Sequence, residues 1–235
     1  MSTGLSQRLH SAAELVRQGA VFADIGTDHA YLPIFLLKRG SISAAYAADI
    51  NEGPLASAVR NAEESGVSDK MHFILTDGIT ALAGLGITDY AVCGMGGELI
   101  ADIIDRAPHL CDGVIRLILQ PMSKQAELRR YLYKNGYAVE REIYSHDAGK
   151  YYVTLAVKYT GEIRDIDLSE AELGLKTPDF ANISCQIGYF KVKIKSLKKK
   201  INGKICGELD AKDEEKLLAE MLSFVALLER ESSNL

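Results

Sequence analysis

AVFADIGTDHAYLP, at residues 20–33, decides the fold of this chain. The apolar residues 20–23 lead into DIGTDH at 24–29, and apolar residues at helical spacing follow from Ala30. This order predicts a buried strand, a tight turn and the start of a helix, which is where an α/β protein usually holds a nucleotide-like ligand. Gly26 allows the backbone to turn sharply and to approach a ligand closely.

Two carboxylates, Asp24 at the strand end and Asp28 in the loop, make this crevice acidic. They would repel the pyrophosphate of a dinucleotide, and the loop lacks the second and third glycines of G-x-G-x-x-G, which disfavours a nicotinamide oxidoreductase. A cationic ligand with a ribose and a zwitterionic tail fits them better. Taken alone, Asp24 is also consistent with a helix-capping or loop carboxylate.

The composition is that of a soluble globular protein, because 47% of the 235 residues are hydrophobic and 25% are charged. The four cysteines lie far apart and form no Cys-x-x-Cys pair, which predicts free thiols in a reducing cytosol and no metal site. No apolar leader is visible in MSTGLSQRLHS, and no stretch approaches the roughly 20 apolar residues that span a bilayer. We therefore expect a cytoplasmic protein with no membrane segment.

Apolar segments with strand character alternate with helical patterns over the first 160 residues. The expected strands are 20–25, 44–49, 71–76, 88–93, 114–119, 137–144 and 151–159, and the expected helices are 5–17, 30–39, 53–65, 79–84, 97–107 and 123–135. This order predicts a doubly wound, Rossmann-like parallel sheet of seven strands, with the last two as an antiparallel hairpin around the turn at 146–150. The outline is similar to that of a class I S-adenosylmethionine (SAM)-dependent methyltransferase.

A helical domain is expected at residues 161–235, after the sheet domain of residues 1–160. Apolar residues from Phe180 to Ile201 recur at alternating spacings of three and four, and the spacing returns from Leu218 to Leu228. The pattern predicts an antiparallel, coiled-coil-like hairpin whose first helix ends at Asn202-Gly203. The same apolar seam would equally fit a partner helix, although no obligate protein partner is evident.

Polar residues end the second, third and fifth strands, where parallel sheets hold ligands. Asp49, followed by Ile50, comes 25 residues after Asp24, where an acid typically accepts hydrogen bonds from ribose hydroxyls. Asp77-Gly78 offers a carboxylate to an adenine amine, and Gln120-Pro121 follows the fifth strand. Alone, Asp49 also fits a helix cap and Asp77-Gly78 an ordinary turn. Together with Asp24 they favour SAM.

The fourth strand ends in Gly94-Met95-Gly96-Gly97, which fits a wall where a flat base approaches the methyl donor, or simply a tight loop. His29 is consistent with a proton carrier or with a histidine held at the helix start. Tyr31 is consistent with a stacking platform or with an aromatic at the rim of the core.

Six stretches in this order resemble the bacterial tRNA (adenine-22-N1)-methyltransferase family: ADIGTDHAYLP, ADINEGPLASA, TDG, CGMGGELIADI, LILQP and GKYYVTLAV. The resemblance covers about residues 5–160 and implies a SAM-dependent enzyme that methylates N1 of an adenine in tRNA. The residues assigned to the cofactor are Asp24, Gly26, Asp49, Ile50, Asp77, Gly78 and Gly94. Asp28 and His29 are expected where cofactor and target meet. The residues assigned to the target pocket are Tyr31, Met95, Gly96, Gly97, Gln120 and Pro121.

The chemistry of adenine N1 agrees with this resemblance. N1 has an in-plane lone pair, so the enzyme needs only to align it with the methyl group and exclude water. Enzymes that methylate an exocyclic amine usually carry an (Asp/Asn)-Pro-Pro-(Tyr/Phe) motif after the fourth strand, and this chain has CGMGG there. Methylation leaves the adenine cationic, and we hypothesise that Asp28 stabilises that charge or accepts a proton.

RNA contacts would have to be regional, because the net charge is −5. Seven lysines and no acids lie between Lys191 and Lys204, and Lys191, Lys195 and Lys198 are candidate contacts. The lysines are equally consistent with a solvated face that pairs with the acidic residues 208–231. Arg129 is a second candidate. Methylation of another RNA or a small molecule, and non-catalytic binding of SAM and RNA, are the alternative functions.

Overall fold

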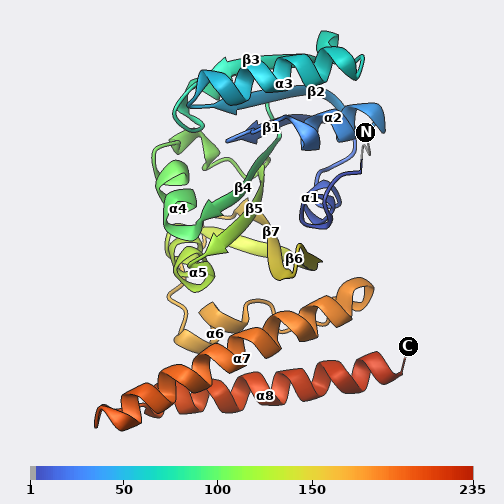
Figure 1. The fold of residues 1–235 in the computed structure, drawn as a ribbon. Helices are drawn as coiled ribbons and strands as arrows, with labels where there is room; N and C mark the ends of the chain where they lie inside the picture. Colours follow the sequence, from blue (N-terminus) through green and yellow to red (C-terminus); the bar gives the residue numbers. More distant parts are fainter. Residues whose placement is uncertain (1–3, 235) are drawn as a thin grey trace.

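Seven strands form one sheet in the order β3-β2-β1-β4-β5-β7-β6, in a computed structural model that describes residues 4–234. The strands are β1 (Ala20–Ile25), β2 (Ile42–Asp49), β3 (Met71–Leu75), β4 (Asp89–Gly96), β5 (Arg116–Ser123), β6 (Tyr137–Asp147) and β7 (Lys150–Tyr159). β1 to β5 run parallel, whereas β7 runs antiparallel to both β5 and β6 (Figure 1). The predicted doubly wound sheet with an antiparallel last hairpin is confirmed.

The hairpin of β6 and β7 closes through two residues, because Asp147 pairs directly with Lys150. Ala148 and Gly149 between them both have positive φ angles, 47° and 77°. Two such residues make the type I′ turn that suits the right-handed twist of paired strands. The strands therefore extend further into the 146–150 segment than the sequence pattern predicts.

Helices cover both faces of the sheet and extend beyond it. They are α1 (Gln7–Ala13), α2 (Tyr31–Lys38), α3 (Glu52–Glu64), α4 (Gly97–Asp105), α5 (Gln125–Lys134), α6 (Leu168–Leu173), α7 (Ile183–Cys206) and α8 (Lys212–Ser233). The helix predicted at 79–84 is only a 3₁₀ turn, Thr80–Leu82. One buried cluster packs α1, α2 and α3 on one face, and a second packs α4 and α5 on the other.

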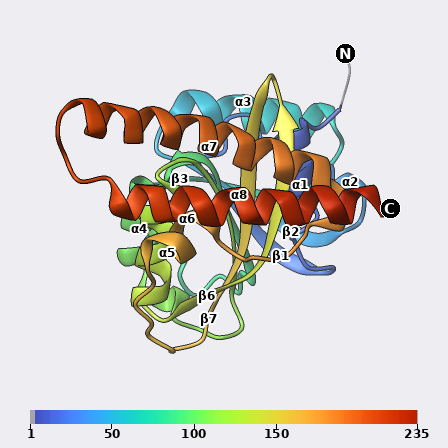
Figure 2. The ribbon, with the colours of Figure 1, turned by 90° about the horizontal axis from the view of Figure 1, so that it is seen from below.

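α7 and α8 lie side by side and antiparallel, as expected (Figure 2). The predicted end of the helix at Asn202-Gly203 is wrong, because α7 continues to Cys206. The Gly207 N–H donates to the carbonyl of Gly203 at its end. A glycine inside a helix costs only about 1 kcal/mol, which packing against α8 offsets. Phe180, the predicted start of the seam, lies in a separate 3₁₀ turn and is exposed. The coiled-coil character of the pair stays a prediction.

The core is continuous across residue 160. Tyr144 on β6 packs edge-on against Tyr189 of α7, with ring centroids 5.2 Å apart. Phe190 of α7 packs in the same way against Phe224 of α8 at 5.3 Å. The helical pair is therefore attached to the β6 edge of the sheet by a buried aromatic cluster.

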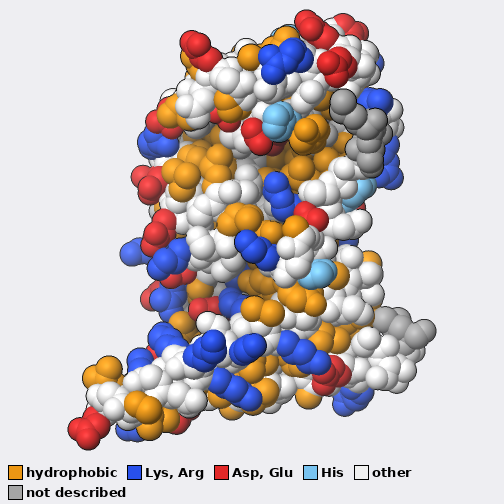
Figure 3. All heavy atoms as spheres, in the orientation of Figure 1, with side chains coloured by type: hydrophobic (Ala, Val, Ile, Leu, Met, Phe, Trp, Pro, Cys, Tyr) orange, Lys and Arg blue, Asp and Glu red, His pale blue; other side chains and the backbone are white. Residues whose placement is uncertain are grey.

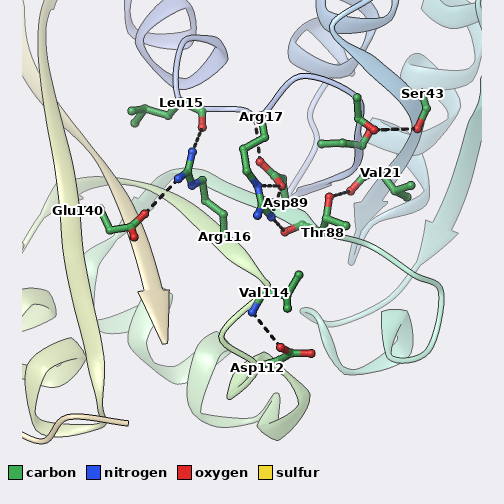
Figure 4. A network of polar contacts seen from close by, with 12 residues as sticks. Leu15, Arg17, Val21, Ser43, Thr88, Asp89, Asp112, Val114, Arg116 and Glu140 are labelled. Atoms are coloured by element: carbon green, nitrogen blue, oxygen red, sulfur yellow. Dashed lines mark hydrogen bonds and ion pairs between the residues drawn. The ribbon is translucent and has the colours of Figure 1, made fainter. Parts of the chain in front are cut away.

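A polar network anchors the segment after α1 to the amino ends of β4 and β5 (Figure 4). The Arg17 side chain donates from Nε to Oδ1 of the fully buried Asp89 at 2.8 Å, and from Nη2 to the Thr88 carbonyl at 2.6 Å. Arg116 of β5 donates to Glu140 of β6 at 3.1 Å. These contacts fix the position of α1 against the sheet.

Candidate active site

The crevice opens where the strand order reverses, with β2 on one side of β1 and β4 on the other. At the carboxyl end of β1, Gly26 has a φ angle of 72°, and its N–H donates to the Ala48 carbonyl at 2.8 Å. A Cβ at Gly26 would overlap the methyl group of Met95, which reaches over from the end of β4. The positive φ angle favours glycine at this position, and the fold brings Met95 to the end of β1.

Asp24 and Asp49 lie at the carboxyl ends of neighbouring strands, and both are buried. The Thr27 hydroxyl donates to Asp24 at 2.7 Å, and the Asn51 N–H donates to Asp49 at 2.8 Å. Burial raises the pKa of Asp24 to about 6, although Thr27 and the charge of Arg8 both act to lower it. Two buried carboxylates beside a bare glycine backbone make a site that suits a ligand carrying hydroxyls and positive charge.

Asp28 and His29 meet at the rim, with the His29 Nε2 3.5 Å from Asp28 Oδ2. The ring of His29 lies 5.2 Å from that of Tyr31, which is 56% exposed. Ala30 between them has a φ angle of 55°, a strained conformation for a residue with a side chain, and Asn61 donates to the His29 carbonyl at 3.0 Å. The strained turn presents an exposed aromatic pair next to the Asp28 carboxylate.

The glycine-rich end of β4 and the first residue of α4 pack tightly against the end of β5, so the strand continues to Gly96 where the sequence predicted a loop. A Cβ at Gly97 would overlap the Lys124 carbonyl, and one at Gly96 would lie 3.4 Å from the Ser123 hydroxyl. Gly94, at a β-bulge, has a φ angle of 79° and faces solvent. Close packing against the Lys124 carbonyl therefore explains Gly97, whereas Gly94 and Met95 remain at the crevice.

Asp77 lies in an exposed loop and forms an ion pair with Arg106 of the segment after α4, at 2.8 Å. That hydrogen bond and the charge of Arg106 lower the pKa of the Asp77 carboxyl. A Cβ at the adjacent Gly78 would lie 3.7 Å from Arg106 and Ile103. Asp77 is thus held ionised at the third strand end, and its contact with an adenine amine stays a prediction.

Exposed apolar side chains surround this end of the sheet. They are Tyr31, Ile50, Leu75, Leu99 and Met122, each 42–62% exposed. Each follows or ends one of the strands β1 to β5, or begins the helix after it. Apolar surface at the rim of an acidic crevice is suited to a nucleobase, which stacks on an aromatic ring such as that of Tyr31.

The chain matches a family model described as "Methyltransferase domain" over residues 5–155. It is 38% identical over 154 residues to the tRNA (adenine(22)-N(1))-methyltransferase of Bacillus subtilis, a match that spans 66% of this chain and 65% of that enzyme. A crystal structure of a putative tRNA (m1A22) methyltransferase from Streptococcus pneumoniae superposes with a TM-score of 0.77 at 30% identity, covering 96% of this chain and 99% of that one. The chain belongs to this methyltransferase family.

A second crystal structure of the pneumococcal family member was solved in complex with S-adenosyl-L-methionine. It matches with a TM-score of 0.76 at 30% identity and covers 99% of that chain. The family's fold thus includes the helical pair α7–α8 as well as the sheet.

The prediction that Arg129 contacts RNA is wrong. Its side chain is 1% exposed and donates to Glu142 at 2.9 Å and to the Ala171 carbonyl at 2.9 Å. A buried guanidinium with these partners has no surface to offer RNA. Arg129 instead joins α5 to β6 and α6.

Gln120 was expected to line the target pocket, but the structure buries it. It is fully buried, and its amide nitrogen donates to the Arg8 carbonyl at 2.6 Å and to the Thr154 hydroxyl at 2.8 Å. Both amide hydrogens are used, so Gln120 supports the crevice from behind. Pro121 beside it is buried as well. Arg8 was missed by the sequence reasoning, because nothing in the pattern of α1 links it to a glutamine 112 residues away.

Some lysines of α7 pair with acidic residues, and others are free to contact RNA, so both interpretations of the sequence apply in part. Several of them form ion pairs with acids, namely Lys191 with Glu229, Lys193 with Glu172, and both Lys200 and Lys204 with Glu214. Lys195, Lys198 and Lys199 are exposed and have no ion-pair partner among residues 4–234. Figure 3 shows basic side chains gathered along α7.

Replacing Asp24 with Asn is expected to stabilise the protein. The unfolded chain has an aspartate pKa of about 3.9, so raising the pH from 4 to 6 ionises the unfolded state first and favours unfolding. Above about pH 6 this costs at most about 3 kcal/mol. Asp24→Asn removes the cost, so urea unfolding should show a gain of about 1–3 kcal/mol near pH 7.5 that falls to about a third of that near pH 4.5 and disappears below about pH 3.9.

The exposed Asp69 provides the control, since Asp69→Asn should change the free energy of unfolding little at either pH. A gain from Asp24→Asn of equal size at both pH values would contradict the prediction.

Proposed function

We propose that this chain transfers the methyl group of SAM to N1 of adenine 22 in tRNA. The observation that carries the proposal is the pair of buried carboxylates, Asp24 and Asp49, at the carboxyl ends of the neighbouring strands β1 and β2. Family membership supports the same activity, because the Bacillus subtilis relative carries that name and a pneumococcal relative was crystallised with SAM.

The residues present fit the cofactor. Asp49 at the end of β2 would accept hydrogen bonds from ribose hydroxyls, and Gly26, with a φ angle of 72°, allows the sharp turn of the backbone at the crevice. When bound, SAM supplies an electrophilic methyl group on a sulfonium. The chain itself must hold the adenine with its N1 lone pair in line and keep water away.

The rim formed by Asp28, His29 and Tyr31 is where the target base would be held. Tyr31 offers an exposed ring for stacking, beside the ring of His29. The adenine becomes cationic as N1 is methylated, and the Asp28 carboxylate stabilises that charge. N1 lies on the Watson–Crick edge, so the adenine must be unpaired or flipped when it enters.

Transfer of labelled methyl from SAM to an unmodified transcript tests this function. The transcript is a tRNA with adenine at position 22, and its control carries guanine there. We expect 1-methyladenosine in the first product and none in the second. Methylation of both transcripts would overturn the position, and cofactor binding with no labelled RNA would overturn the activity.

The three unpaired lysines of α7 are proposed to contact tRNA phosphates. Replacing Lys195, Lys198 and Lys199 together with Gln should weaken tRNA binding and lower the slope of log K against log salt by about 2, since each phosphate contact contributes about 0.7–0.9. The measurement is tRNA binding over a salt series.

The control removes three cations from α8 instead, through Lys212→Gln, Lys216→Gln and Arg230→Gln, so that both variants have the same net charge. Equal loss of affinity in the two variants would show a general charge effect and contradict a contact by α7.

A further inference from the structure

The tip of the β6–β7 hairpin carries an aromatic pair that the methyl-transfer site does not use. His146 and Tyr151 lie opposite each other on the two strands, and their ring centroids are 4.5 Å apart with a tilt of 40°. His146 is exposed, whereas Tyr151 is half-buried. The His146 ring is therefore supported by Tyr151 while it stays accessible to solvent.

Helix α7 holds this pair in place. A Cβ on Gly188 would overlap the ring of Tyr151, so that ring lies directly on the backbone of α7. Figure 2 shows the hairpin, in yellow, crossing this helix. The turn beyond the pair has only two residues, which leaves the strand ends little freedom. An aromatic ring that is already fixed in this way loses little conformational entropy when a ligand binds.

The pair lies at the same edge of the sheet as the crevice. Because β7 runs antiparallel to both β5 and β6, β6 runs in the direction of β1 to β5, and His146 is near its carboxyl end. β7 is the second strand from β4, so Tyr151 is about 10 Å from β4 across the sheet at the usual strand spacing. A base held there would belong to a nucleotide close to the target adenine, not to the target itself.

Cations lie on both elements that form this surface. Lys150 follows the hairpin turn and is exposed, whereas Asp147 before the turn is half-buried. Lys195 and Lys199 come seven and eleven residues after Gly188, about two and three helical turns, and so share the face of α7 on which the hairpin packs. An exposed, supported ring with cations on the adjoining elements suits a polyanion that offers unpaired bases.

We propose that His146, supported by Tyr151, stacks on an unpaired tRNA base within two nucleotides of the target adenine. The inference rests on the proposed function, in which adenine 22 of tRNA is methylated. Extruding an adenine leaves a neighbouring base without a stacking partner. A ring at the hairpin tip replaces that partner, and it accepts any base because every base has a π-face.

Binding of tRNA transcripts, measured with S-adenosylhomocysteine present, tests the inference. His146→Ala should weaken binding of the intact transcript by about 5- to 100-fold, the range for losing one base–aromatic stack. His146→Phe keeps an aromatic ring and should stay within about twofold of the unaltered protein. Further transcripts each carry one abasic nucleotide within two positions of adenine 22. For at least one of them, His146→Ala should cause no further loss, because the stacked base is already absent.

His72→Ala is the matched control. His72 is also exposed and stacks on a tyrosine of the neighbouring strand, Tyr46, with centroids 4.7 Å apart, but it lies near the amino end of β3. Its replacement should leave the affinity for every transcript within about twofold. Unchanged binding of S-adenosylhomocysteine alone shows that each variant is folded.

Three results would overturn the inference: no loss from His146→Ala, an equal loss for all transcripts, or a loss from His146→Phe as large as that from His146→Ala. The proposed function stands in each case if the unaltered protein still methylates the intact transcript. If the unaltered protein methylates no transcript, the proposed function fails, and this inference fails with it.

Discussion

Arg129→Met is expected to lower the free energy of unfolding by about 3–5 kcal/mol, the usual effect of removing one partner from a buried ion pair. The Arg129 and Glu142 side chains are 1% and 2% exposed, and Arg129 Nη2 lies 2.7 Å from Glu142 Oε1. Glu142 also accepts hydrogen bonds from the Tyr144 hydroxyl at 2.8 Å and the Leu175 N–H at 3.3 Å. Without Arg129, its charge would stay buried and uncompensated. Urea unfolding followed by circular dichroism measures the loss.

Arg130→Met is the control, because Arg130 is the next residue on α5 and its side chain is exposed. We expect a change of at most about 0.5 kcal/mol for that variant. The double replacement Arg129→Met with Glu142→Met should recover part of the stability, since it leaves no buried charge. Similar losses from Arg129→Met and Arg130→Met would show that the buried pair does not stabilise the junction.

The burial of Arg129 shows where the sequence reasoning was limited. A charged residue near the fifth strand was interpreted as surface, because arginine is rarely buried without a partner. Its partner Glu142 lies on a different element, and that pairing is a tertiary contact. One local signal was available, since Arg129 precedes Leu132 and Tyr133 by three and four residues and so shares their apolar face.

The sheet itself was predictable because its information is local. Each of the buried strands β1 and β4 appears as an apolar run, and the alternation with helical spacing determines a parallel order. The carboxyl-end residues Asp24 and Asp49 follow directly from that order. Arg8, in contrast, is held at the crevice by Gln120, which lies 112 residues further along the sequence. No spacing pattern in the sequence predicts a contact over such a separation.

A large effect is also expected on the rate of methyl transfer when Asp28 is replaced. Asp28→Asn should lower the single-turnover rate of methyl transfer by about 10²–10³-fold, the range for removing an electrostatic group from a reaction centre. The side chain is 79% exposed at the rim and is not among the hydrogen-bonded acids of the cofactor site. We therefore expect the affinity for S-adenosylhomocysteine to stay within about twofold of the unaltered protein's.

Two further variants separate the role of Asp28 from that of the cofactor site. Asp49→Asn should mainly weaken S-adenosylhomocysteine binding, because Asp49 is buried at the end of β2. Asp28→Glu keeps the negative charge that Asp28→Asn removes, so it should retain more activity if charge stabilisation is what matters. Full activity in Asp28→Asn would exclude both charge stabilisation and proton acceptance. A loss of cofactor affinity as large as the loss of rate would instead place Asp28 in the cofactor site, because an interaction used only in the transition state leaves ground-state binding unchanged.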